Sequence, residues 1–300
     1  FISSGPYKVE NVEIGKQYIL TKRHDWPDFS PNSPDKVIIT HEIPSEKEKH
    51  RNLILDTRKP IEHVPDSLKR FALVPEYLNT ILLGNLNKGF FGSIDNRHAL
   101  DEAIQKVRSQ FAGKWPNQKQ SSFFYPSQQL NKRPIPSFKW NKPNVPLVIE
   151  GSAPDSNIPR LLAWNILRSA LDLLDWKYAF KNNPQTWADV TNPNHDIRIR
   201  NPSIGGGVEA WGLNILFFSP MGIQMPDPSG RVKNMLTKFE HGGISEQELT
   251  DSFLQVVEED AAIIPISHFG VEWFISDTIN ARSISPLISI IRFDKTEINE

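Results

Sequence analysis

The sequence predicts an α/β fold in which helices cover a parallel or mixed β-sheet. The first observation is the alternation of elements between residues 146 and 204, where strands at 146–150, 176–180 and 196–204 accompany a helix at 158–174. Strand–helix–strand order of this kind is typical of parallel or mixed sheets. The second observation is composition. A chain of 300 residues with 38% apolar and 23% charged side chains is typical of a soluble globular protein with one large or two medium domains.

The charge and the cysteine content exclude several classes of protein. The net charge is −1 and no long block of like charges occurs, so nothing indicates binding to nucleic acid or to an anionic membrane. The absence of cysteine excludes disulfides and thiolate metal sites, and it fits either a bacterial periplasm or a cytoplasm. No apolar run approaches the roughly 20 residues that span a bilayer. Because the chain begins at Phe1 without a signal-like region, we expect it to be processed or excised, with any targeting signal upstream.

The first part of the chain is predicted to be rich in β-structure. A turn at 13–16 separates two strands that form a hairpin, and a β-branched run indicates a third strand. Ser45 and Glu48 have the spacing of a capping box, which predicts a short helix as far as about Leu55. The expected elements are strands at 5–9, 17–21, 36–41 and 79–86, and short helices at 45–55 and 65–71.

The remaining elements follow from apolar spacing and capping signals. In the segment 96–111, Leu100, Ile104 and Val107 recur with helical spacing. Ser245 and Glu248 form a second capping-box pair ahead of a helix at 246–259. The other expected elements are an irregular connection at 112–146, inward-facing Leu162, Ile166, Ala170 and Leu173 in the helix at 158–174, a helical turn at 185–190, a helix at 209–218, a loop at 220–230, a buried strand at 261–266 and a β-rich tail to 291.

Three consecutive glycines, Gly205, Gly206 and Gly207, follow the strand at 196–204. Glycines at this position let backbone N–H groups approach a ligand without obstruction by Cβ atoms. With Ala210 they satisfy Gly-x-Gly-x-x-Ala, as in a dinucleotide fingerprint, and Asp227 lies near the distance of the acid that such a site needs. That acid lies in a loop and not at the end of a strand. We therefore favour an ordinary tight strand-to-helix turn, or a turn that lines a ligand-binding cleft, over a dinucleotide site.

Metal binding and catalysis find little support in the sequence. His268 with Glu272, and His195 beside Asp196, supply two donors each, whereas zinc needs three or four convergent ligands. We therefore expect these histidines to be at the surface or satisfied by hydrogen bonds. No Gly-x-Ser-x-Gly elbow, His-Glu-x-x-His pair or Walker loop occurs, which predicts that the chain is not an enzyme. We also expect the acids at 258–260, at a helix C-terminus, to be solvated. Trp164, Trp176 and Trp187 are expected to be core residues.

The order of several short patterns resembles the C-terminal two-thirds of family 5 extracellular solute-binding proteins, the oligopeptide, dipeptide and nickel-binding type that serves ABC importers. The patterns are Ser4-Gly5-Pro6-Tyr7-Lys8-Val9, Arg23-His24-Asp25-Trp26, Asp95-Asn96-Arg97-His98-Ala99-Leu100, His195-Asp196-Ile197 and Asp260-Ala261-Ala262-Ile263-Ile264-Pro265-Ile266. The chain departs from the family at His98, where the family has an arginine. The order of the patterns over nearly the whole chain carries the resemblance.

The resemblance implies a periplasmic-binding-protein-like type II fold, with two lobes of mixed sheets joined by two crossing strands. Residues 1–88 and 263–300 are then a partial first lobe, and residues 89–262 the second. The crossing strands are expected at 79–86 and 263–269. The N-terminal part of the family fold has no counterpart in this sequence.

The function implied by the resemblance is that of the solute-binding component of an ABC import system, which encloses a small ligand, an oligopeptide by preference, between its lobes. The expected ligand-binding residues are Ser203, Gly205, Gly206, Gly207, Glu209, Trp211, His268 and Phe269, with no catalytic residue, metal or cofactor. The Trp-x-x-Asp-Tyr spacing of the family's peptide-binding members is not preserved at Glu209 and Trp211. The expected partner is an ABC permease in the membrane and the expected location is periplasmic or at the cell surface, as a monomer without nucleic acid. The alternatives are a cytoplasmic ligand-sensing domain of a transcriptional regulator and a nucleotide-using enzyme.

Overall fold

The computed structural model describes residues 5–40, 54–57, 66, 68–111, 118–125, 139–151, 158–182, 195–202, 210–218, 224–280, 282 and 293–299. The chain divides into two compact units, which are described separately below. Unit 1 consists of Phe1–Val74 and Val271–Glu300, and unit 2 of Pro75–Gly270. In the described part of the chain, no helix combines the length and the apolar character needed to cross a bilayer.

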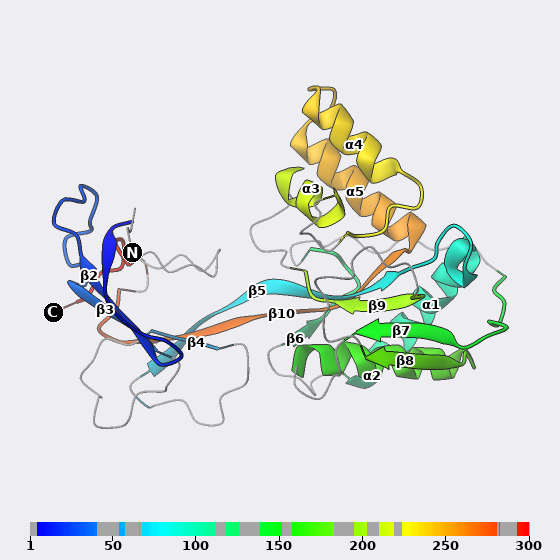
Figure 1. The fold of residues 1–300 in the computed structure, drawn as a ribbon, viewed down its shortest axis with the longest axis horizontal. Coiled ribbons are helices and arrows are strands. Elements are labelled where there is room, and N and C mark those ends of the chain that lie inside the picture. Colours follow the sequence, from blue (N-terminus) through cyan, green and yellow to red (C-terminus); the bar gives the residue numbers. More distant parts are fainter. Residues whose placement is uncertain are drawn as a thin grey trace. The chain divides into compact units, whose positions relative to one another are not determined.

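Unit 1 begins with a three-stranded antiparallel sheet in the order β1-β2-β3 (blue in Figure 1). The strands are β1 Tyr7–Glu13, β2 Gln17–Lys22 and β3 Lys36–Thr40. Gly15 turns the chain between β1 and β2 with a φ of 79°, a backbone conformation that glycine adopts without steric cost. The predicted hairpin and the third strand are confirmed as far as Thr40.

The structure corrects the end of one predicted helix in unit 1 and contradicts a second. Residues 45–53 lie outside the described part, but Ile54 and Leu55 belong to a strand, β4 Ile54–Thr57, which pairs with β10 Ile263–Ser276. The helix predicted at 65–71 is wrong, because Leu68 begins the long strand β5 Leu68–Leu83. Cross-strand ion pairs accompany this strand. Arg70 lies 2.6 Å from Glu272, and Lys69 lies 2.7 Å from Asp277. Pairing with β10 overrides the weak local helical pattern.

Unit 2 contains the mixed sheet that the alternation of strands and helices predicts. The strands β7 Leu147–Gly151, β8 Tyr178–Asn182 and β9 Ile197–Arg200 are parallel, and β5 runs antiparallel to β9. The order of neighbours is β10-β5-β9-β7-β8. A short strand, β6 Gln118–Gln120, pairs with β10 inside the segment that was predicted to be irregular. The segment at 185–190 lies outside the described residues.

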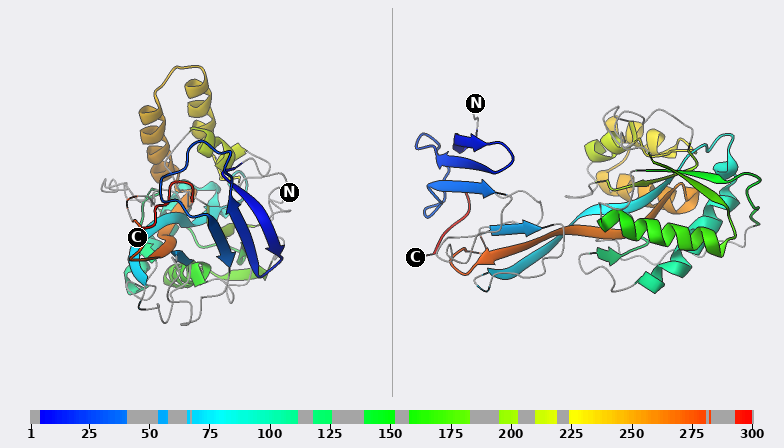
Figure 2. Two further views of the ribbon diagram at one scale, coloured as in Figure 1. Left: turned by 90° about the vertical axis from the view of Figure 1, so that its left-hand side faces the viewer. Right: turned by 60° about the horizontal axis from the view of Figure 1, so that its bottom comes forward.

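Helices cover both faces of this sheet (Figure 1). One face carries α1 Ile94–Arg108, between the short 3-10 turns η2 Phe90–Gly92 and η3 Ser109–Phe111, and α2 Ile158–Leu173. The other face carries α3 Ala210–Phe218, α4 Arg231–Glu240 and α5 Glu246–Asp260. The sequence analysis missed α4, which lies beside α5 (Figure 2). The capping box predicted at Ser245 and Glu248 is present at the start of α5.

The core of unit 2 follows the predicted apolar faces with one exception. Leu100, Ile104 and Val107 of α1 are buried together with the inward side of α2. Leu173, predicted to face inward, is 56% exposed, and the chain instead buries Trp176 just beyond the helix. A side chain at the last helical residue is no longer directed by the packing of the preceding turns, so apolar periodicity is least informative there.

Two strands connect the units. β5 and β10 each begin in one unit and end in the other, and they are neighbours in the sheet. The segments predicted to cross, 79–86 and 263–269, belong to these strands, with β5 ending at Leu83, but the chain passes between the units at Val74–Pro75 and Gly270–Val271, just outside both segments. The predicted lobe boundaries at 88 and 263 remain a prediction, because compactness alone does not define the walls of a binding cleft.

A buried cluster of charges lies between β7 and β9. Glu150 and Arg198 are register partners on these parallel strands, and their side chains are only 8% and 6% exposed. The Nε and Nη2 groups of Arg198 donate to Oε2 of Glu150 at 3.2 and 3.0 Å. Nδ1 of His195 lies 3.3 Å from the same oxygen. Buried charges are tolerated when they are paired in this way, and a single remaining charge would be costly.

Replacing one member of this pair is expected to destabilise the protein more than replacing both. Arg198→Met leaves the Glu150 carboxylate buried without its main partner, which costs about 3 kcal/mol of the free energy of unfolding. The double variant Glu150→Gln with Arg198→Met should recover most of that loss, measured by urea denaturation. Lys106→Met, which removes an exposed pair with Glu102 on α1, is the control and should leave the denaturation midpoint nearly unchanged. Equal losses in the single and double variants would contradict the role of the pair.

Candidate functional site

The candidate site lies where β9 ends beside β5. Ile197 and Ile199 point into the core that α1 and α2 cover, as their alternation predicts. The ladder between the two strands ends at the pair of Thr80 and Arg200. Beyond it, the backbone N–H of Leu78 donates to the carbonyl oxygen of Pro202 at 3.0 Å, so the end of β9 stays against β5.

Most of the predicted ligand wall lies outside the described residues. These are Ser203, Gly205, Gly206, Gly207 and Glu209. Trp211 lies in the first turn of α3, and its side chain is outside the described part. The role of these residues in ligand binding remains a prediction.

A row of buried polar side chains joins β10, β5 and the end of β9. The amide nitrogen of Asn79 donates to Oγ of Ser267 at 2.8 Å, and the amide oxygen of Asn79 accepts from Nδ2 of Asn201. The hydroxyl of Thr80 donates to the carbonyl oxygen of Ile264 at 3.1 Å. Asn79, Thr80 and Ser267 are fully buried, so these bonds replace contacts with water. This row was not predicted from the sequence, because the residues that meet in it are far apart in the chain.

The two site residues predicted on β10 are both buried. Nε2 of His268 lies 3.1 Å from the carbonyl oxygen of Phe124. Because a carbonyl only accepts, Nε2 carries the proton in this hydrogen bond and has no lone pair for a metal. The ring of Phe269 stacks on that of Tyr77, with centroids 5.2 Å apart and planes 18° from parallel. Tyr77 precedes Leu78, whose backbone N–H donates to Pro202, so this aromatic pair lies near the end of β9.

The other metal candidates lie beside different side chains or backbone groups. Glu272 pairs with Arg70, and His195 lies beside Glu150 in the buried charge cluster. Oδ2 of Asp196 accepts the backbone N–H of Val148 at 2.8 Å. In the described ranges, no group of three or more His, Asp or Glu side chains could hold a metal ion.

The acid of the dinucleotide fingerprint has a structural role. The carboxylate of Asp227 accepts the backbone N–H groups of Val232 and Lys233, at 3.3 and 3.0 Å, at the start of α4. Acidic side chains satisfy the free N–H groups of a helix N-terminus in this way. Asp227 therefore binds the start of α4, a helix that was not predicted from the sequence. The dinucleotide-fingerprint interpretation needs this carboxylate for a ligand, so the structure speaks against that interpretation.

Two of the patterns that carry the family resemblance contact each other. Nε of Arg97 donates to the carbonyl oxygen of Asp260 at 2.6 Å, so α1 is tied to the end of α5 just before β10 begins. Burial lowers the pKa of Arg97 and also that of the neighbouring His98. The carboxylate of Asp260 accepts from Ser229 and Arg231, both at 2.6 Å, and is 6% exposed. The expectation of a solvated acid at this position is wrong.

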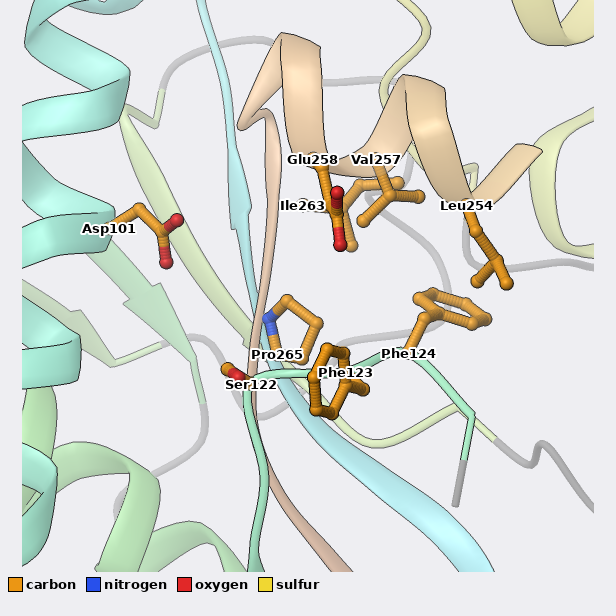
Figure 3. A pocket seen from close by; sticks show the side chains of 9 residues that line it. All are labelled: Asp101, Ser122, Phe123, Phe124, Leu254, Val257, Glu258, Ile263 and Pro265. Atoms are coloured by element: carbon orange, nitrogen blue, oxygen red, sulfur yellow. The ribbon is translucent and has the colours of Figure 1, made fainter. Parts of the chain in front are cut away.

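A small cavity in unit 2 is no candidate for a peptide site (Figure 3). It lies between α1, α5, β10 and the segment 121–125, with the carboxylates of Asp101 and Glu258 and the ring of Phe124 on its walls. Its volume of about 10 Å³ holds about one water molecule.

Solved structures with a similar fold are solute-binding proteins. NikA from Brucella suis in complex with Fe(III)-EDTA matches with a TM-score of 0.70 and 12% identity, over 98% of this chain and 68% of that one. The dipeptide-binding protein from Pseudoalteromonas sp. SM9913 in complex with Met-Leu matches with a TM-score of 0.65 and 13% identity, over 99% and 64%. The periplasmic murein tripeptide-binding protein MppA, in its unliganded open form, matches with a TM-score of 0.64 and 14% identity, over 98% and 63%.

The chain spans about two thirds of the length of these structures, between 63% and 68%. No protein-family model matches the sequence, and no curated protein matches it. The likeness therefore lies in the fold. The chain has the fold of the periplasmic solute-binding proteins of the nickel-, peptide- and EDTA-binding kind, which is the fold that its resemblance to family 5 implies.

Proposed function

We propose that the protein is the solute-binding component of an ABC import system, and that it binds a small ligand, an oligopeptide by preference, between two lobes. The observation that carries this proposal is the match of nearly the whole chain to solute-binding proteins, including an ABC transporter substrate-binding protein from Listeria monocytogenes. The two crossing strands support it as well. Two lobes joined by a few strands can close on a ligand by a hinge motion.

Two considerations support a peptide or a chelate as the class of ligand. Structures of similar fold hold Fe(III)-EDTA, Ni(L-His)2 and the dipeptide Met-Leu. In the part of this chain that the structure describes, no cluster of side chains could hold a bare metal ion. We propose that a metal, if bound, is held in a chelator, as in the complexes with Fe(III)-EDTA and Ni(L-His)2. Glu209 and Trp211 support a peptide, since an acid and an aromatic ring suit a ligand's amino group.

The proposed site consists of the wall at Ser203, Gly205–Gly207, Glu209 and Trp211, with His268 and Phe269 on β10. The glycines allow backbone N–H groups close to the ligand. His268 donates to Phe124, so it contributes by fixing β10 beside the ligand. Phe269 is buried beneath the partly exposed ring of Tyr77, and Tyr77 is proposed to present the aromatic surface to the ligand.

The proposed setting is periplasmic or at the cell surface, with an ABC permease as the partner, and the protein is proposed to act as a monomer that binds no nucleic acid. Proteins of this fold include periplasmic ones. No observation in the described part of the chain favours a transcriptional sensor or a nucleotide-using enzyme.

Calorimetric titration is expected to detect a ligand. We predict saturable heat, with one site per chain, when Met-Leu, a mixed tripeptide pool or Fe(III)-EDTA is added to the full-length protein. NAD and ATP serve as controls and should neither release heat nor raise the melting temperature. The proposal would be abandoned if no peptide or chelate gave heat while a nucleotide protected the protein against unfolding.

Removing the negative charge of Glu209 should weaken a ligand with a cationic or amino group. We predict that Glu209→Gln raises Kd for a bound peptide about tenfold, the loss of roughly one charge-assisted hydrogen bond. Glu246→Gln, a change of the same kind on an exposed residue of α5, is the matched control. An unchanged Kd in Glu209→Gln would leave the glycine turn with a structural role only.

A further inference from the structure

The outer edge of the sheet in unit 2 carries unpaired backbone groups. β8 is the last strand in the order β10-β5-β9-β7-β8, and in the described part of the chain no strand pairs with its other side (Figure 1). The backbone N–H of Leu147 on β7 donates to the carbonyl oxygen of Lys177 at 2.9 Å. Because alternate residues of a strand face the same neighbour, the backbone groups of Tyr178 and Phe180 point away from β7. An exposed edge of this kind is a template for one more strand.

Aromatic side chains line one face of this edge. The ring of Phe180, which is 37% exposed, packs edge-to-face against that of Trp164 on α2, with centroids 4.9 Å apart. The ring of Tyr178 lies 6.4 Å from that of Trp164. The guanidinium of Arg168, one turn further along α2, lies 6.0 Å from the Trp164 ring, and its Nε donates to the hydroxyl of Tyr178 at 3.3 Å. The edge therefore has apolar ring surface and a cation beside its outward backbone groups.

Lysines occupy the opposite face of the same strand. Side chains alternate along a strand, so Lys177, directly before β8, and Lys181 within it share the face away from α2, and both are exposed. Among the described residues, neither lysine nor Arg168 forms an ion pair, and Asp175, two residues before Lys177, pairs with Lys142 instead. β8 thus presents two positive charges, four residues apart, that no acidic side chain of the described residues pairs.

The spacing of the lysines selects against a second copy of this chain. Two β8 strands that paired antiparallel about Ala179 would bring Lys177 of one copy opposite Lys181 of the other, twice in the same ladder, and like charges directly opposite are destabilising. Lysines at a sheet edge commonly prevent such self-pairing. The same two charges favour a strand with acidic side chains four residues apart. Between those acids, the side chains that face the rings of Tyr178 and Phe180 are expected to be apolar.

We propose that β8 is a docking edge for an extended acidic segment of a partner protein, which adds to the sheet as one more strand. Backbone hydrogen bonds to Tyr178 and Phe180 supply affinity, and the lysines and the aromatic rings select the segment by charge and by apolar contact, as in other cases of strand addition. The inference goes beyond the proposed function and does not depend on it, because the residues that carry it lie on α2, on β8 or directly before β8.

The probe is the pentapeptide Glu-Val-Thr-Val-Glu, blocked at both ends, with a fluorophore as the N-terminal block. Its sequence reads the same in both directions, so it can pair with β8 in either orientation. An excess of unlabelled Met-Leu is present, so that a site for free peptides is occupied. We expect the fluorescence anisotropy to rise saturably with the full-length protein, and Lys-Val-Thr-Val-Lys to bind about tenfold more weakly. A fully N-methylated acidic peptide, which lacks the backbone donors, should not bind.

Charge reversal on the protein locates the peptide. The double variant of Lys177→Glu and Lys181→Glu should prefer the basic peptide to the acidic one, because the sign of both cross-strand contacts is reversed. The matched control is the double variant of Lys233→Glu and Lys238→Glu, which changes two exposed lysines of α4 and should keep the preference for the acidic peptide. All four substituted side chains are exposed, so the urea midpoints of both variants should stay close to that of the wild type.

Amide exchange followed by NMR separates strand addition from attraction by charge alone. The amide protons of Tyr178 and Phe180 should exchange with solvent about tenfold more slowly when the acidic peptide is bound, because they then donate hydrogen bonds. Binding without this protection, equal binding of the acidic and basic peptides, or no saturable binding would each overturn the proposal. Displacement of the peptide by Met-Leu would assign it to the proposed ligand site and would also overturn the proposal. A dimer of the wild type that dissociates in Phe180→Asp would assign the edge to a second copy instead.

Discussion

The structure depends on two strands that serve both compact units. β5 and β10 are neighbours in the sheet; β5 begins in unit 1 and ends in unit 2, and β10 begins in unit 2 and ends in unit 1. In unit 2, helices cover both faces of the sheet that contains β5 and β10. The buried polar side chains of these two strands must therefore find hydrogen-bond partners inside the protein. Asn79 and Thr80 do so across the two strands. These bonds hold β5 beside β10, and in unit 2 the strands β9 and β6 pair with the two of them.

The candidate site follows from the same constraint. β9 pairs with β5, and Asn79 and Leu78 hydrogen-bond to the residues just after β9. The predicted ligand-binding segment therefore begins where the chain is held against β5. The charge cluster of Glu150 and Arg198 fixes the next strand, β7, against β9. A rigid sheet with its variable segments at strand ends is the usual way in which α/β proteins present a ligand site. Chemistry at the wall can then change without disturbing the sheet.

Sequence reasoning predicted the elements whose signals are local. The capping box at Ser245 and the apolar stripe of α1 are examples, because both depend on residues within one or two turns. The helix predicted at 65–71 was wrong because pairing with β10, some 200 residues later, decides the conformation of that segment. The partners of Asn79 are 188 and 122 residues away, and no spacing rule connects them. Of the candidate site, His268 and Phe269 are seen as buried residues with partners, while the wall at 203–209 remains a prediction from the glycine pattern and the family resemblance.

The central proposal is that the protein closes on a ligand about its two crossing strands. Small-angle X-ray scattering of the full-length protein, alone and saturated with whichever probe binds in the titration, tests that claim most directly. The account predicts a smaller radius of gyration in the presence of ligand, because hinge closure brings two lobes together. Saturable binding with an unchanged scattering curve would contradict it.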